Sequence, residues 1–157
     1  MNVRTTILLA GLPLALVQDH ASPGGAMTQP EPDREILDVI ETWNQAFAAN
    51  DPDRYFTFID EDITVLTPSN PYRVEGIPDD REEFEWGIRT GRSRVGYFQE
   101  MQRHVQRYGD VAVVTYFSRG SYGPDGEEVV AYLKETDVLV RREDGWKIVH
   151  IHVSANR

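Results

Sequence analysis

The sequence contains no cysteine, which excludes disulfide bonds, thiolate zinc sites and a thiol nucleophile. Basic residues are few: 16 Lys and Arg stand against 26 Asp and Glu, and the net charge is −10. Proteins that bind nucleic acids gather Lys and Arg into patches that displace counterions, and this chain has no such run. Its longest apolar stretch is too short to span a membrane. Neither nucleic acid nor a membrane is therefore expected as a partner.

The composition is otherwise that of a globular protein. The chain has 157 residues, of which 40% are hydrophobic and 27% are charged. A chain of this length can bury a substantial core, and it has the usual size of one domain. We therefore expect a single folded domain rather than a disordered chain.

The first 26 residues differ from the rest. Residues 7–17 are apolar and follow Arg4, which is the outline of a weak secretory signal peptide. Gly24 and Gly25 shortly precede Met27, and their codons could instead hide a ribosome-binding sequence for translation from this methionine. Residues 1–26 are interpreted as an extension outside the domain. A misassigned start would leave the protein cytoplasmic, a signal peptide would export it, and an ordered extension is the third alternative.

Apolar residues at helical spacing predict three helices in the first part of the domain. Asp53 could cap a short second helix that carries Tyr55. The third helix spans residues 79–93, and its acidic beginning "PDDREEFE" is interpreted as solvent-exposed. The first helix, residues 33–50, has side chains three and four positions apart that predict one buried face: Ile36, Leu37, Ile40, Trp43 and Phe47.

Most of the chain after Arg94 is predicted to form strands. The turn sequences "GD", "GPDG" and "EDG" separate β-rich runs and are typical of hairpins. Helices early and long strands late indicate an α+β domain, with three helices packed on one face of a curved, mainly antiparallel sheet. Such a cone leaves a pocket for a small ligand, and its long strands should contain bulges. The predicted strands are residues 63–68, 94–108, 111–122, 128–141 and 146–154.

The last strand contains two histidines, His150 and His152, in an apolar run. Strict alternation places them on one face of the sheet with Trp146 and Ile148. The opposite face would then carry Val149, Ile151 and Val153 and would be buried in a homodimer, because it would otherwise leave an exposed apolar patch.

The hairpin loops set which residues of the neighbouring strands share the histidine face. A last turn of two or four residues puts Asp137 on this face, whereas a three-residue turn would put it on the other. A two- or four-residue turn at "GPDG" places Tyr116 beside Glu135 and Asp137. The sequence therefore predicts one face that holds Tyr116, Glu135, Asp137, His150 and His152.

These residue types suggest general acid-base catalysis. Asp137 would fix the tautomer of His150 or His152, the imidazole would remove a proton or activate water, and Tyr116 would stabilise an oxyanion. The same histidines could instead be hydrogen-bonded core residues without a catalytic role. Two His and one Asp also resemble a metal-binding triad, but neighbours on one face of a sheet seldom converge on one ion. No metal or other cofactor is predicted.

Five further residues are candidates for the lining of the pocket. Three are tryptophans, which are interpreted first as core residues and second as a surface on which a ligand would stack. The set comprises Trp43, Tyr55, Trp86, Glu135 and Trp146.

Residues 33–155 resemble a SnoaL-like domain of the nuclear transport factor 2-like superfamily. The resemblance rests on "WNQAFAANDPDRYFTFIDEDITVLTP", "YRVEG" and the C-terminal "GWKIVHIHVS". This last motif is similar to the ending of the calcium/calmodulin-dependent kinase II association domain. The resemblance implies a cone-shaped α+β fold, a pocket between helices and sheet, and commonly a dimer formed through the sheet.

The resemblance does not decide the function, because the superfamily includes isomerases, cyclases, dehydratases, epoxide hydrolases and non-catalytic hubs. The kinase association domain has an arginine at the position that matches Asp137, so a carboxylate-binding role is not carried over. Asp137 and Tyr116 are residue types that a ketosteroid isomerase uses, but not in the motif of that family. We expect a small-molecule-binding protein, either a cofactor-independent isomerase, cyclase or hydrolase, or a ligand-binding or oligomerisation module without catalysis.

Overall fold

The computed structural model describes residues 31–156, so the extension of residues 1–26 lies outside the described residues. The helices are α1 (Glu31–Ala48), α2 (Pro52–Tyr55), the 3-10 turn η1 (Phe56–Phe58) and α3 (Ile77–Thr90). The strands are β1 (Ile59–Leu66), β2 (Val74–Glu75), β3 (Val95–Tyr108), β4 (Val111–Tyr122), β5 (Val129–Arg142) and β6 (Gly145–Ala155).

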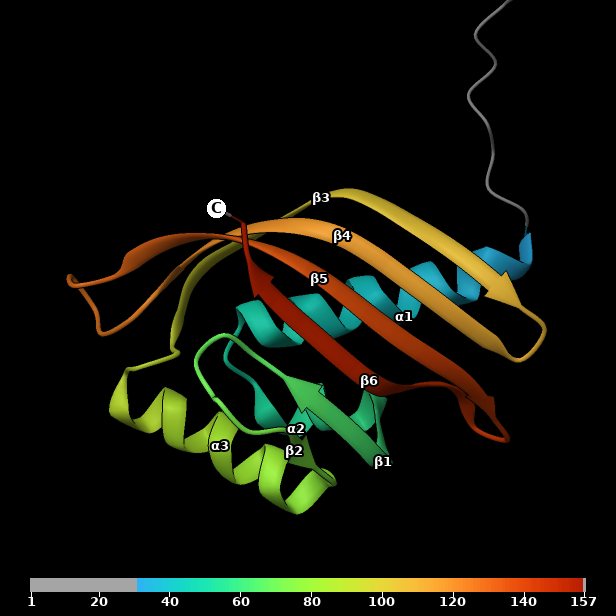
Figure 1. Ribbon diagram of the computed structural model, residues 1–157, viewed down its shortest axis with the longest axis horizontal. Coiled ribbons are helices and arrows are strands. Elements are labelled where there is room, and N and C mark those ends of the chain that lie inside the picture. The colour runs from blue at the N-terminus through green and yellow to red at the C-terminus, as the bar shows by residue number, and fades with distance from the viewer. Residues whose placement is uncertain (1–30, 157) are drawn as a thin grey trace, which may run out of the picture.

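The six strands form one sheet in the order β2-β1-β6-β5-β4-β3. Only β1 and β6 pair in parallel, and every other pair is antiparallel. Figure 1 shows the sheet bending over α1, with α2 and α3 on the same side as α1. The predicted α+β cone with three helices on a curved, mainly antiparallel sheet is confirmed. No helix in residues 31–156 is long and apolar enough to cross a membrane.

Helix α1 packs on the sheet through the face that its apolar spacing predicts. Ile36 and Ile40 are completely buried there, and Trp43 is nearly so. After the helix, Asn50 adopts a left-handed conformation with φ of 54°, which asparagine tolerates better than most residues. Its side chain exchanges two hydrogen bonds with the backbone of Val95, at 2.9 and 2.8 Å. This contact fixes the end of α1 to the beginning of β3.

The short helix α2 begins two residues earlier than expected. The side chain of Asp51, not that of Asp53, caps it by accepting a hydrogen bond from the backbone N–H of Arg54 at 3.1 Å. Pro52 follows the cap, where its missing N–H leaves no donor unsatisfied. The correction arises because Asp51-Pro52 both ends the first helix and starts the second.

Inward-facing side chains of the sheet and the apolar face of α1 form a continuous core. Along β4 and β5 the burial alternates with period two, as the hairpin "GPDG" predicts. Tyr116 pairs with Glu135, and Val114 pairs with Asp137, so all four face the interior. The predicted grouping of Tyr116, Glu135 and Asp137 is confirmed.

A bulge in β6 separates the two halves of the strand. Leu139 pairs with Ile148, but Val138, the residue before Leu139 in β5, pairs with His150. Val149 is therefore an extra residue that opposes no partner, and it reverses the alternation of all residues after it. A second irregularity lies in β3 at Gln102, whose φ is 55°. Bulges were expected in these long strands, but their positions were not.

Candidate functional site: the cavity of the cone

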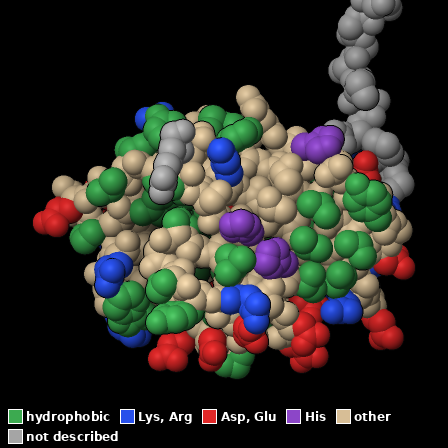
Figure 2. Space-filling view, viewed as in Figure 1, with side chains coloured by type: hydrophobic (Ala, Val, Ile, Leu, Met, Phe, Trp, Pro, Cys, Tyr) green, Lys and Arg blue, Asp and Glu red, His purple; other side chains and the backbone are tan. Residues whose placement is uncertain are grey.

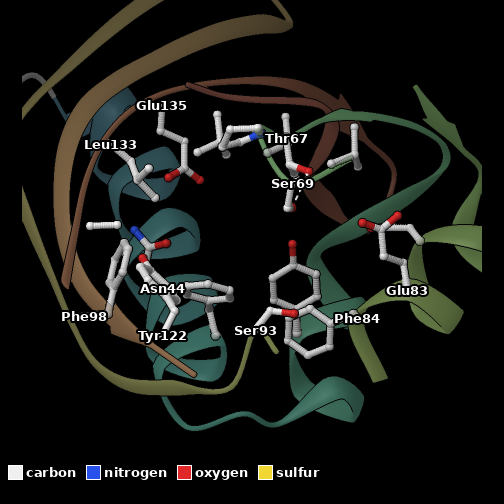
Figure 3. Close-up of a pocket in the computed structure, with 18 of the residues that line it drawn as sticks. Asn44, Thr67, Ser69, Glu83, Phe84, Ser93, Phe98, Tyr122, Leu133 and Glu135 are labelled. Carbon is white, nitrogen blue, oxygen red and sulfur yellow. Dashed lines mark hydrogen bonds between the residues drawn. The ribbon is translucent and has the colours of Figure 1, made fainter. Parts of the chain in front are cut away.

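A cavity of about 310 Å³ lies between the helices and the concave face of the sheet. Tyr55 stacks on Phe84 with 4.5 Å between ring centroids, and Phe47 meets Phe98 edge-on at 5.4 Å. Figure 3 shows the open centre of the cavity, with Phe84 and Phe98 on its wall. The volume lies within the range of pockets that bind small molecules in other proteins. Six aromatic rings line the cavity: Trp43, Phe47, Tyr55, Phe84, Phe98 and Tyr122.

Two carboxyl groups reach this apolar space from different walls. Glu135 comes from β5, and Figure 3 shows its carboxylate pointing inward, on the side where Asn44 also enters the cavity. Asp80 comes from the first turn of α3 and is 8% exposed. Its Oδ2 atom has no hydrogen-bond partner among the described residues. The rim carries a third carboxylate, Glu83, which accepts a hydrogen bond from Asn70 at 2.7 Å.

Burial makes both inner carboxyls weak acids. Burial raises the pKa of Glu135 to about 7, opposed in part by its contact with the Tyr116 hydroxyl. Burial, with the nearby Glu83 carboxylate, likewise raises the pKa of Asp80 to about 7. A carboxyl group with this pKa is present in both protonated and ionised forms at neutral pH, and can therefore give or accept a proton.

Behind Glu135 lies a second layer of buried polar groups. Asp137 is completely buried, and neither of its carboxylate oxygens has a hydrogen-bond partner among the described residues. Burial and the neighbouring Glu135 carboxylate raise its pKa well above the usual value. Burial also raises the pKa of Tyr116, and the acids Asp137 and Glu135 raise it further. Tyr116 and Asp137 therefore favour their neutral forms, and Glu135 is the member of this group that reaches the cavity.

Asn44 connects this group to α1 and β3. The Tyr116 hydroxyl donates to Asn44 Oδ1 at 3.4 Å, and Asn44 Nδ2 donates to Glu100 Oε2 at 2.8 Å. Arg103 holds the Glu100 carboxylate through both of its oxygens. This chain of contacts holds the amide of Asn44 in place at the wall of the cavity.

The structure contradicts the predicted pairing of Asp137 with a histidine. Asp137 pairs with Ile151, which faces the core, while His150 pairs with Val138 and His152 with Thr136 on the outer face. The extra residue at Val149 causes this reversal. For the same reason Ile151 and Val153 line the cavity instead of the outer face. The predicted site of Tyr116, Asp137 and two histidines is therefore wrong.

The histidines instead lie on the outer surface of the sheet. His152 is exposed, and His150 is partly buried beside β1, where its Nδ1 atom is 2.7 Å from the hydroxyl oxygen of Thr64. Burial and the neighbouring His152 lower the pKa of His150.

Three of the five predicted pocket residues line the cavity: Trp43, Tyr55 and Glu135. The other two do not. Trp86 points away from the cavity on α3 and is 41% exposed, with the guanidinium of Arg92 above its ring. Trp146 is buried in the core below Arg107 and Arg141, which lie 5.3 and 5.9 Å from its ring centroid. Both corrections concern tertiary position, since a tryptophan in a sequence indicates burial but not a particular cavity.

Sequence reasoning missed Asp80 and Asn44. Asp80 belongs to the acidic beginning of α3, which was interpreted as solvent-exposed. Nothing in the sequence distinguishes it from Asp79, which is exposed. Asn44 follows Trp43 on the buried face of α1, and a polar residue at a core position is the one signal that could have identified it.

The bent sheet, the helices on its concave face and the cavity between them define a cone of the nuclear transport factor 2-like class. The sequence of residues 32–157 matches the calcium/calmodulin dependent protein kinase II association domain, and the chain belongs to this family. The resemblance that the sequence indicated is thereby confirmed. No curated protein matches the chain.

Several solved structures share the fold. A nuclear transport factor 2-like protein of unknown function from Pseudomonas putida superposes with a TM-score of 0.70 at 22% identity, over 80% of this chain and 87% of that one. A kinase II hub from S. rosetta has a TM-score of 0.68 at 26% identity, covering 82% and 100%. A candidate ketosteroid isomerase from Parabacteroides distasonis has a TM-score of 0.62 at 24% identity, covering 78% and 86%.

Proposed function

We propose that the protein binds a small, largely apolar molecule in the cone cavity and moves a proton to or from it through Glu135, without a cofactor. The observation that carries this proposal is a carboxyl group of pKa about 7 that points into an aromatic cavity. A base in an apolar site is stripped of water, and its pKa near neutrality suits proton transfer in either direction. Glu135 thus takes the role that the sequence suggested for a histidine.

The groups behind Glu135 are positioning residues. The Tyr116 hydroxyl, which lies against Glu135, donates its hydrogen bond to Asn44, so the carboxyl has a polar neighbour whose position is fixed. Asp137 favours its neutral form next to Glu135, and so adds no full negative charge that would drive the pKa of Glu135 higher still. Proton transfer of this kind is the step that isomerases, cyclases and hydrolases of the predicted type have in common.

The proposal can be tested without knowledge of the natural substrate. In 5-nitrobenzisoxazole, removal of the ring C–H proton by a base breaks the N–O bond and releases a coloured cyanophenolate. We expect this reaction to accelerate as the pH rises through about 7 and to slow by at least about 100-fold in Glu135→Gln. Glu143→Gln, an exposed carboxyl in the last turn, is the matched control and should change nothing. A rate that follows a pKa near 4.5, or that survives Glu135→Gln, contradicts the proposal.

A second proposal concerns the outer face of the sheet, which the helices leave uncovered. We infer that two copies associate through this face. The sequence predicted a homodimer through a face made of Val149, Ile151 and Val153, but Ile151 and Val153 line the cavity, so other side chains must form the contact. Large apolar side chains there are exposed, among them Phe117 at 38% and Tyr132 at 49%, and Figure 2 shows histidines between hydrophobic patches on this face. The family is named for association, and hubs are among the solved structures with this fold. This association leaves the cavity on the other face free.

Analytical ultracentrifugation tests this second proposal. The wild-type protein should sediment as a dimer or larger assembly at micromolar concentration, and Phe117→Lys should shift it toward monomer because a charge would be buried in the interface. Val129 is exposed at the beginning of β5, so Val129→Lys is a control for the effect of an added surface charge. A wild-type protein that stays monomeric throughout would rule out the association.

A further inference from the structure

The charges around the cavity are nearly all negative. Glu135 and Asp80 enter it, and Glu83 lies at its rim. Among residues 31–156 the one basic residue that lines it is Arg92. The guanidinium of Arg92 lies over the exposed ring of Trp86, 5.2 Å from its centroid, and no described Arg or Lys is among the groups that shift the pKa of Asp80 or Glu135. The inner carboxyls therefore have no cation from the described chain opposite them.

The unpartnered state of Asp80 is the second observation. Buried polar atoms in proteins almost always have a hydrogen-bond partner, and an ionised carboxylate is especially costly to bury alone. Asp80 is more than nine-tenths buried, lines the cavity, and leaves Oδ2 without a partner among the described residues. A ligand that donates hydrogen bonds or carries positive charge would satisfy it.

The aromatic walls favour the same kind of ligand. The face of an aromatic ring carries partial negative charge and attracts a cation within about 6 Å of its centroid. Trp43, Tyr55 and Phe84 contribute such rings. Among the described residues no group of three or more His, Asp or Glu side chains could hold a metal ion, whereas an alkyl or aryl group on a nitrogen cation would pack against these walls.

We propose that the ligand of the cavity is an organic cation, an amine or ammonium group carried on an apolar body, with its charge between Asp80 and Glu135. The inference rests on the proposed function of the cavity as a small-molecule site and names the chemical class of the ligand. The uncompensated carboxyls, the unpartnered Asp80 and the aromatic walls together select a cation. They select against a carboxylate, which both acids would repel.

Proton linkage gives the proposal a quantitative signature. A bound cation favours the ionised form of each carboxyl, so binding at neutral pH should release protons. Each carboxyl of pKa about 7 that must ionise makes binding about tenfold tighter at pH 8 than at pH 6. The groups that face Glu135 are Tyr55, Tyr116, Tyr122, Asp137 and Glu100, and those that face Asp80 are Glu83 and Tyr55. The one cation beside this set, Arg103, is bound to both oxygens of Glu100, and none of the other described neighbours carries a positive charge that would replace the ligand.

Three probes of one skeleton separate charge from shape: benzylammonium, benzyl alcohol and benzoate. Isothermal titration calorimetry with the full chain at pH 6 and pH 8 should show benzylammonium as the tightest ligand and benzoate as the weakest. The dissociation constant of benzylammonium should fall about tenfold or more between the two pH values. Titrations in buffers of different ionisation enthalpy should show proton release on binding.

Variants of the two inner carboxyls test where the cationic group of the ligand binds. Asp80→Asn and Glu135→Gln should each weaken benzylammonium binding and reduce its pH dependence. Asp79→Asn, an exposed neighbour in the same helical turn, should bind as the wild type does. Thermal melts of all three variants check that each is folded, and the comparison of the three probes on the wild type stands without them.

The other outcomes separate the two proposals. If benzyl alcohol binds as tightly as benzylammonium, or benzoate binds best, the ligand is not a cation. If the benzisoxazole reaction still depends on Glu135 in that case, the proposed function stands, and only the proposal that the ligand is a cation is wrong. If no probe binds and no reaction occurs, both proposals fail.

Discussion

Replacing Glu135 by glutamine should stabilise the protein at alkaline pH. The pKa of this carboxyl rises from 4.5 to about 7 on folding, so the folded state binds its proton more tightly than the unfolded state does. The contribution of this carboxyl to the stability of the protein is fully present at a pH below its pKa in the unfolded state. That contribution is lost as the pH rises through its pKa in the folded state. The loss therefore falls between about pH 4.5 and pH 7, and at pH 8 it reaches about 3 kcal/mol.

Glutamine cannot ionise, and so the variant avoids this loss while keeping a polar group beside Tyr116. The free energy of unfolding, measured by urea denaturation, should exceed that of the wild type by up to about 3 kcal/mol at pH 8 and by less than about 1 kcal/mol at pH 5. Glu143→Gln, in the exposed turn, should show no such difference between the two pH values. A Glu135→Gln protein that is less stable than the wild type at pH 8 would show that the carboxylate has a compensating partner and that the burial argument is wrong.

Further substitutions test the site and the core. Asn44→Ala removes the donor to Glu100 and should lower the free energy of unfolding by about 1–3 kcal/mol; a loss below about 0.5 kcal/mol would show that water replaces the amide. Leu139→Ala in the completely buried core should cost about 2–5 kcal/mol in urea melts, and a smaller loss would mean that the core closes around the gap. Gln102→Gly should stabilise the bulge of β3 by up to about 1 kcal/mol, because φ of 55° favours glycine; a lower melting temperature would contradict this. His152→Ala should leave the benzisoxazole rate within about twofold of wild type, and a large decrease in this rate would show that the histidines contribute to catalysis.

The sequence by itself determined the main features of the domain. Apolar spacing predicted the helices, hairpin turns predicted the long strands, and the final motif indicated the family. Parity across "GPDG" correctly placed Tyr116, Glu135 and Asp137 on one face, because β4 and β5 pair without interruption. Alternation is reliable over such a stretch, since each residue of one strand opposes one residue of the other.

Only the tertiary structure decided which side chains meet at the cavity. One extra residue at Val149 reverses the second half of β6, moving both histidines to the outer face. The sequence carries no local signal for it, because a bulge is selected by the fit of the whole strand to β5, β1 and the core. Asp80 illustrates the same limit. It differs from exposed Asp79 only in the direction in which α3 packs, and rings from separate elements, Tyr55 and Phe84 among them, form the cavity that it lines. Its raised pKa is therefore a property of the assembled cone.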